Sequence, residues 1–219
     1  MSGAFTQQTG VPGVTNTEQP PPFAFDDASN AEIEAILLKY PPSRSASGIL
    51  PILYLAQGQM LRDTGSAWIS RPAMDVIAAR LNMPPIRVYE VATFYLMFNT
   101  SPIGRYHLQL CGTTPCWLRG SDEVARACRD ETGIAAMGNT SADRLFHLSE
   151  VECLGACVNA PILQVDDDYY EDLDYERTVA LLRALRRGEK PQPGSVIGRL
   201  TSAPEGGPTT LNTIPIAGE

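Results

Sequence analysis

Apolar residues recur with a helical period through the first hundred positions of the chain. Ser29 followed by Glu32 has the form of a helix-capping box, and an apolar stripe runs from there to a pair of prolines. Proline, glycine and asparagine then delimit three further helical stretches. The helices are expected at about 29–40, 47–62, 70–82 and 84–98. Four short helices with short connections predict a small helical bundle.

The period changes to two after Pro102, where apolar and polar residues alternate as in a strand with one buried face. A turn at Asp166–Asp168 predicts a hairpin between the last two such stretches. Strands are expected at about 106–110, 145–149, 162–165 and 169–171, and helices at about 121–131 and 174–187. This order predicts a small four-stranded mixed sheet covered by helices, the outline of a thioredoxin-like α/β domain.

Proline- and glycine-rich segments flank these two regions, in a chain of 219 residues with 18 glycines and 18 prolines. Such segments bury too little surface to offset the entropy of ordering, so we expect extended tails. An arm laid across another subunit, anchored by Leu200, Leu211 and Ile214, is the alternative for the second tail. The predicted domains are an N-terminal tail (1–24), a helical bundle (25–100), an α/β domain (101–190) and a C-terminal tail (191–219).

Composition and charge exclude several classes of protein. Lys and Arg number 17 against 25 Asp and Glu, and the net charge of −8 disfavours a nucleic-acid partner. No apolar run approaches the ~20 residues that cross a bilayer, and the N-terminus lacks the pattern of a secretory signal or a transit peptide. We therefore expect a soluble protein of a reducing compartment, without direct membrane insertion.

Four of the five cysteines form two closely spaced pairs. Cys111 and Cys116 enclose Gly-Thr-Thr-Pro, whereas Cys153 and Cys157 enclose Leu-Gly-Ala. Each pair follows a predicted strand, and loops at one edge of an α/β sheet converge. Four thiolates there could hold a zinc ion or a 2Fe-2S cluster, or form two disulfides; zinc sites more often have two residues between paired cysteines, so the spacing favours the cluster.

Several other residues have plain structural interpretations. Cys128 shares a helix face with apolar residues and is expected to be a buried small hydrophobe. His107 and His147, the two histidines of the chain, are expected to be hydrogen-bonded within the sheet. Trp117 is expected to pack against or shield the cysteine site. Ala160-Pro161 precedes a predicted strand, where a thioredoxin-like fold keeps a cis proline.

The cysteine motifs resemble those of a known family. Cys111–Cys116 and the run from Glu152 to Pro161 are similar to the thioredoxin-like 2Fe-2S ferredoxin subunit of respiratory complex I, NADH:quinone oxidoreductase. Val88–Tyr95 looks like the last helix of that family's bundle, and the resemblance covers about 31–190. The tail at 203–208 is similar to mitochondrial and related bacterial forms.

The resemblance implies that all four residues Cys111, Cys116, Cys153 and Cys157 ligate one 2Fe-2S cluster. It also implies an electron-transfer subunit, without independent catalysis, that packs against a flavoprotein subunit holding FMN and the NADH site. The large iron–sulfur subunit would be a second partner. The implied location is the cytoplasmic peripheral arm of an inner-membrane complex. Because the ligands would all be cysteines and Glu150 and Glu152 lie close to them in the sequence, we expect a low reduction potential.

Other functions stay open from the sequence. The matching diaphorase subunit of an NAD-linked hydrogenase or formate dehydrogenase would carry similar motifs, a free ferredoxin shuttle would need only the cluster domain, and a zinc-stapled scaffold would have no redox role. The chain has no Gly-x-Gly-x-x-Gly after a strand, which disfavours a resident NADH site. It has no Cys-x-x-Cys, which disfavours thiol–disulfide exchange.

Overall fold

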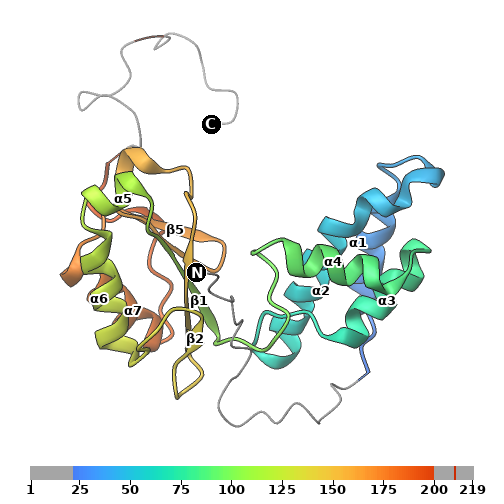
Figure 1. Cartoon of the computed structure of the whole chain (residues 1–219), viewed down its shortest axis with the longest axis horizontal. Helices are drawn as coiled ribbons and strands as arrows, with labels where there is room; N and C mark the ends of the chain where they lie inside the picture. Colours follow the sequence, from blue (N-terminus) through green and yellow to red (C-terminus); the bar gives the residue numbers. More distant parts are fainter. Residues whose placement is uncertain (1–21, 200–209, 211–219) are drawn as a thin grey trace, which may run out of the picture. The chain divides into compact units, whose positions relative to one another are not determined.

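The chain divides into two compact units between Arg105 and Tyr106 (Figure 1). The computed structural model describes residues 22–199 and Thr210, so the predictions for most of both tails lie outside the described residues. In the described part of the chain, no helix is both long and apolar enough to cross a membrane.

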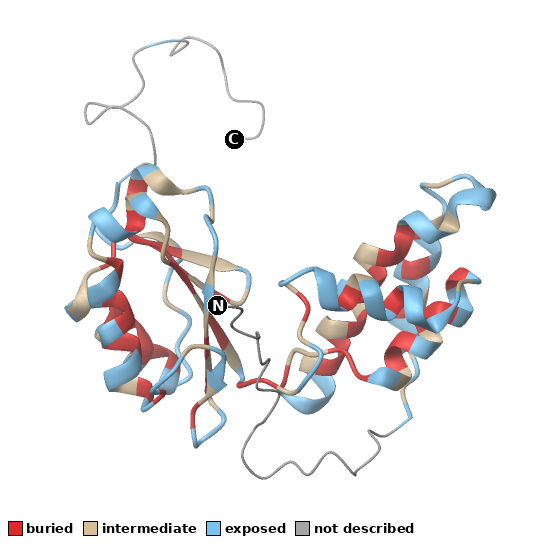
Figure 2. Ribbon diagram, viewed as in Figure 1, coloured by how far each residue is buried: buried red, intermediate tan, exposed pale blue. Residues whose placement is uncertain are grey.

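Within residues 22–105, the first unit is a bundle of four α-helices, as the periodicity predicts. The apolar stripes of these helices face one another, and Ile33, Ile52, Leu53 and Ile77 are fully buried between them (Figure 2). The helices are α1 (Asp27–Leu37), α2 (Ile49–Thr64), α3 (Arg71–Leu81) and α4 (Pro85–Phe94), with a 3-10 segment η1 (Pro42–Gly48) before α2.

The predicted capping box at Ser29 is wrong, because α1 begins one turn earlier. Asp26 is the N-cap, and its carboxylate accepts a hydrogen bond of 2.6 Å from the backbone N–H of Ser29. Two side chains of α2 hold Asp26 in place: Gln59 accepts from its N–H at 3.0 Å, and Arg62 forms an ion pair of 2.8 Å with its carboxylate. Ser29 is buried inside the helix instead.

The other helix ends follow local signals more closely. α2 stops at Gly65, which has a left-handed backbone with φ of 75°, and Ser70 caps α3 through the N–H of Ala73. The last helix is shorter than predicted: α4 ends at Phe94, because Tyr95 has an extended backbone. Phe98 returns to the core of the bundle.

The second unit contains a mixed sheet of six strands within residues 106–195, in the order β2-β3-β1-β4-β5-β6. β1 pairs parallel with β3 and antiparallel with β4, and β5 pairs parallel with β6. Four of these strands are the predicted ones; the additional β2 and β6 have two residues each, too short to show a period. The strands are β1 (Tyr106–Cys111), β2 (Asn139–Thr140), β3 (Phe146–Val151), β4 (Leu163–Val165), β5 (Asp168–Glu171) and β6 (Gly194–Ser195).

Two helices, α6 (Ser121–Thr132) and α7 (Tyr175–Arg186), pack side by side against this sheet (Figure 1). Leu108 and Leu148 from the central strands and Leu182 from α7 meet in the core and are at most 1% exposed. The parallel pair β1 and β3 is therefore held at the centre of the unit. Both strands end at the same edge, and the loops that carry the cysteines start there.

Candidate metal centre

The first cysteine pair lies at the end of β1 and is buried. Cys111 is the last residue of β1, and its N–H donates a hydrogen bond of 3.4 Å to the carbonyl of Ile162. Cys116 lies in α5 (Thr114–Leu118), a helix of five residues that follows β1. Pro115 in its first turn favours this short helix. Both sulfur-bearing residues are only 1% exposed.

The second pair lies at the surface of the unit. Cys153 follows β3, and Cys157 opens the 3-10 turn η2 (Cys157–Asn159). Their Sγ atoms are 3.5 Å apart, well beyond the ~2.05 Å of a disulfide, and all five cysteines of the chain, which are all described, are free thiols. The predicted alternative of two disulfides is therefore not the form that the structure shows.

Thr113 connects the two pairs. Its hydroxyl lies 3.2 Å from the Sγ of Cys111 and also hydrogen-bonds the thiol of Cys153. The charge on Cys111 in turn acts on both Cys153 and Cys157. The two loops thus bring two pairs of sulfurs to the same edge of the sheet.

Backbone N–H groups surround these sulfurs. The N–H of Gly155 donates to the Sγ of Cys153 at 3.4 Å, and the left-handed backbone of this glycine, with φ of 80°, is one that a larger residue rarely adopts. Other N–H groups, of Leu154 and Ile162, bond to Cys111 and Cys116 respectively. Such donors stabilise negative charge on sulfur, so the donor set suits thiolates bound to metal.

The four thiols differ in acidity. Burial raises the pKa of Cys116 to about 12, and its hydrogen bond to Cys111 adds to this effect. Burial also opposes ionisation of Cys111, but hydrogen bonds from Thr113 and from a backbone N–H outweigh it and lower the pKa. The N–H of Gly155 lowers the pKa of Cys153. Each pair therefore contains one thiol that ionises more readily than its neighbour.

The sulfurs are arranged as two pairs and not as one tight group. Among residues 22–199, no three His, Cys, Asp or Glu side chains converge closely enough to hold a single metal ion. The carboxylate of Glu150 lies over Gly112, where a Cβ atom would come within 2.6 Å of its Oε1. This carboxylate therefore lies beside the backbone of Gly112, the residue that follows Cys111.

Three further predictions concern residues outside the cysteine pairs. Cys128 is fully buried on α6, which confirms its prediction as a small hydrophobe. Trp117 is 57% exposed, and the prediction that it packs against or shields the cysteine site stays a prediction. Ala160-Pro161 has the predicted cis peptide bond.

The two histidines are hydrogen-bonded within the sheet, as predicted. The Nε2 atom of His107 lies 2.7 Å from the Oγ of Ser149, and the Nδ1 atom of His147 lies 2.8 Å from the Oγ1 of Thr140. Burial lowers the pKa of His107 to about 3, with a contribution from the charge of His147, and burial lowers the pKa of His147 to about 4. Both rings are therefore neutral at physiological pH.

We expect these histidines to make the fold sensitive to acid. In the unfolded chain each histidine takes up a proton near pH 6.5, whereas in the folded chain it does not. The contribution of these neutral histidines to the free energy of unfolding is therefore complete above about pH 6.5 and declines as the pH falls toward 4. As the pH falls through this window, protonation of each histidine in the unfolded chain should lower the free energy of unfolding by about 1.4 kcal/mol per pH unit. Urea unfolding of the wild type and of His107→Gln across the window measures the slope. An equal slope in the two proteins would contradict the assignment.

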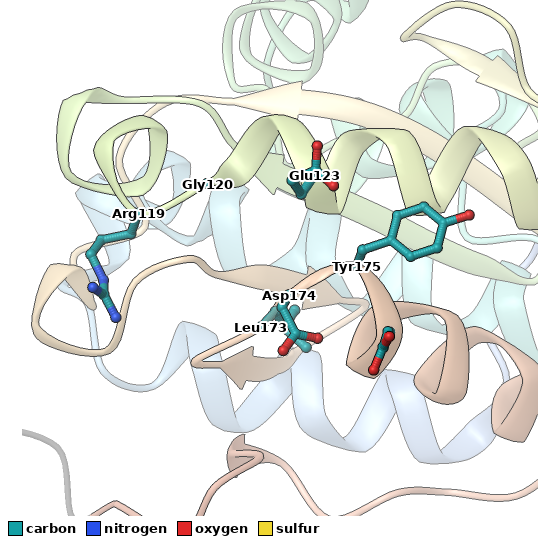
Figure 3. A pocket seen from close by; sticks show the side chains of 7 residues that line it. Arg119, Gly120, Glu123, Leu173, Asp174 and Tyr175 are labelled. Carbon is teal, nitrogen blue, oxygen red and sulfur yellow. The ribbon is translucent and has the colours of Figure 1, made fainter.

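A pocket in the same unit is separate from the cysteines. It lies where α6 and α7 begin and is lined by Arg119, Glu123, Asp174 and Tyr175, among others (Figure 3). Asp174 already caps α7 by accepting from the N–H of Arg177 at 2.8 Å. None of the four paired cysteines lines this pocket, so it is not part of the metal centre.

The sequence analysis missed a group of polar residues behind the second cysteine pair. Asn159, which is completely buried, contacts Glu171 and Arg199, and Arg199 pairs with Asp172. Only Asn159 belonged to a recognised motif. The signal available in the sequence was an asparagine two residues after a cysteine, while its partners lie in distant segments that only the structure brings together.

Comparison with known proteins gives consistent results. Residues 33–186 match the family described as thioredoxin-like 2Fe-2S ferredoxin. The chain is 49% identical over 164 residues to a subunit of the NADH-quinone oxidoreductase of Rickettsia bellii (strain RML369-C), covering 75% of this chain and 95% of the relative. It is 50% identical over 160 residues to the corresponding protein of Rickettsia typhi (strain ATCC VR-144 / Wilmington), covering 73% of this chain and 91% of the relative.

A solved structure shows a related fold. The NAD+-reducing NiFe-hydrogenase in the air-oxidized state superposes with a TM-score of 0.54 at 20% identity, covering 64% of this chain and 23% of the hydrogenase chain. At that identity the likeness concerns the fold alone. The family match, in contrast, extends through both structural units and includes all four paired cysteines. This chain belongs to the thioredoxin-like 2Fe-2S ferredoxin family.

Proposed function

We propose that Cys111, Cys116, Cys153 and Cys157 hold one 2Fe-2S cluster and that the chain is an electron-transfer subunit of an NADH-quinone oxidoreductase. The observation that carries this proposal is the meeting of two sulfur pairs, from two separate loops, at one edge of the sheet. Two pairs suit two irons better than one ion. The names of the relatives support the assignment to this oxidoreductase.

A bound 2Fe-2S cluster would supply one-electron transfer without making or breaking bonds in a substrate. The protein's own contribution is to hold and tune it. Cys111 and Cys116 are buried and would keep water from one side of the cluster. Cys153 is exposed and would leave the other side of the cluster accessible to a partner. The neighbouring carboxylate of Glu150 disfavours added negative charge, so we expect a low reduction potential.

The surface around the cysteines suits a permanent partner. Trp117 and Leu118, next to Cys116, are 57% and 70% exposed, and Val158, next to Cys157, is 52% exposed. Large apolar side chains on a surface are typical of regions that another protein covers. We propose that this partner is the flavoprotein subunit that holds FMN and the NADH site, with the large iron–sulfur subunit as a further neighbour on the peripheral arm.

The proposed function predicts a spectroscopic signature. The full chain, purified without its partner subunits, should contain iron and acid-labile sulfide in equal amounts, absorb visible light when oxidised, and give an electron paramagnetic resonance signal when reduced. A colourless protein that contains zinc would contradict the cluster and indicate the structural alternative.

The partners distinguish two candidate complexes. Co-purification with a flavoprotein and with membrane-arm subunits is the expected result. The fold likeness to the NAD+-reducing hydrogenase makes a diaphorase subunit the second candidate. Co-purification with a hydrogenase large subunit would establish that alternative and contradict the first.

A further inference from the structure

Asn159 closes the turn that begins with Cys157, and its side chain is held from two sides. It is 0% exposed. Its Nδ2 atom donates a hydrogen bond of 2.6 Å to the Oε2 atom of Glu171, and its Oδ1 atom accepts one of 2.5 Å from the Nη2 atom of Arg199. Glu171 ends β5, whereas Arg199 lies beyond β6. The turn is therefore tied to two segments that are distant from it in the sequence.

Arg199 makes further contacts that orient its guanidinium group. Its Nη2 atom also donates to the carbonyl of Val158 at 2.6 Å, and its Nε atom lies 3.2 Å from the Oδ2 atom of Asp172. The side chain of Asp172 is only 5% exposed and also accepts a hydrogen bond of 2.6 Å from the hydroxyl of Ser195 in β6. Two residues of the Cys157 turn and one buried carboxylate thus share a single cation.

Backbone hydrogen bonds also hold the turn, and the carbonyl of Asn159 accepts one of 2.7 Å from the N–H of Asp172. Within it, the N–H of Asn159 bonds to the carbonyl of Ala156 at 3.0 Å, and the N–H of Ala160 bonds to the carbonyl of Cys157 at 3.3 Å. Cys153 and Cys157 lie toward the surface, unlike the buried pair at the end of β1. The hydrogen-bond geometry of short 3-10 turns is poorer than that of α-helices. The side-chain network behind Asn159 therefore adds to the restraints on the position of Cys157.

We propose that Arg199 is a positioning residue: it clamps the turn that carries Cys157 and thereby sets the reduction potential of the cluster. This proposal rests on the function proposed above. The clamp also has an electrostatic consequence. Arg199 neutralises the buried carboxylate of Asp172 behind the turn that carries this ligand. Removal of the cation leaves that negative charge unpaired and disfavours the reduced state, so the potential falls.

The test uses the full chain in its purified complex and three variants. Arg199→Gln removes both the positive charge and the planar guanidinium group with its several N–H donors. Arg199→Lys keeps the charge but cannot form the same set of hydrogen bonds. Arg187→Gln is the matched control, because Arg187 pairs with Glu189 at the surface. Two quantities are measured: the midpoint potential of the cluster by redox titration, and hydrogen–deuterium exchange of the peptide that contains Val158.

Arg199→Gln is expected to shift the midpoint potential to a more negative value and to accelerate exchange in the peptide several-fold. Arg199→Lys should lie between this variant and the wild type, and Arg187→Gln should match the wild type in both measurements. The proposal is overturned if Arg199→Gln and Arg187→Gln have the same potential, whether or not exchange changes. A wild-type protein without any cluster would contradict the proposed function itself, which separates the two failures.

Discussion

Substitution of Cys111, Cys116, Cys153 or Cys157 by Ser is expected to abolish most of the cluster signal in each case. A serine hydroxyl is far less acidic than a thiol and is a weaker ligand for iron, so each change removes one of four bonds that hold the irons. Iron and sulfide content per chain and the electron paramagnetic resonance amplitude measure the loss.

Cys128→Ser is the matched control, because the same chemical change is made at a cysteine on the buried face of α6. Its hydroxyl can bond to the carbonyl one turn earlier, so the helix tolerates it. The cluster signal should remain close to that of the wild type. Equal losses in all five variants would overturn the ligand assignment and indicate that general unfolding removes the cluster.

Phe146→Ala is expected to destabilise the second unit by about 3–5 kcal/mol, the range typical of removing a buried aromatic ring. Phe146 is 0% exposed in β3, stacks on Tyr106 with a ring-centre distance of 5.8 Å, and is covered by the guanidinium group of Arg186 at 5.2 Å. The substitution leaves a cavity between the sheet and α7. Urea unfolding, followed by circular dichroism, measures the change in the free energy of unfolding.

Leu118→Ala provides the comparison for this measurement. Leu118 is 70% exposed, and a surface truncation of this kind changes stability by no more than about 0.5 kcal/mol in the isolated chain. A similar loss in both variants would show that Phe146 does not anchor the core. If Leu118→Ala instead weakens co-purification with the flavoprotein, the result supports the proposed partner surface without changing the stability argument.

Local signals predicted most helix ends, and tertiary contacts explain the exceptions. Gly65 and Ser70 were identified because each acts on the backbone of its own helix. The start of α1 was not, because Asp26 is selected as the cap partly by Gln59 and Arg62 of the next helix. α5 and the strands β2 and β6 are too short to show a period, so no pattern in the sequence could indicate them.

The sequence by itself determined the two units, the central strands and the four cysteines of the candidate site. These features depend on periodicity and on spacing, which are properties of adjacent residues. Only the tertiary structure decided what surrounds the cysteines: which pair is buried, how Thr113 links the loops, and how Arg199 reaches a turn 40 residues earlier in the chain. Contacts between distant segments form only when the chain closes on itself, because the sheet and its helices bring those segments to the same edge.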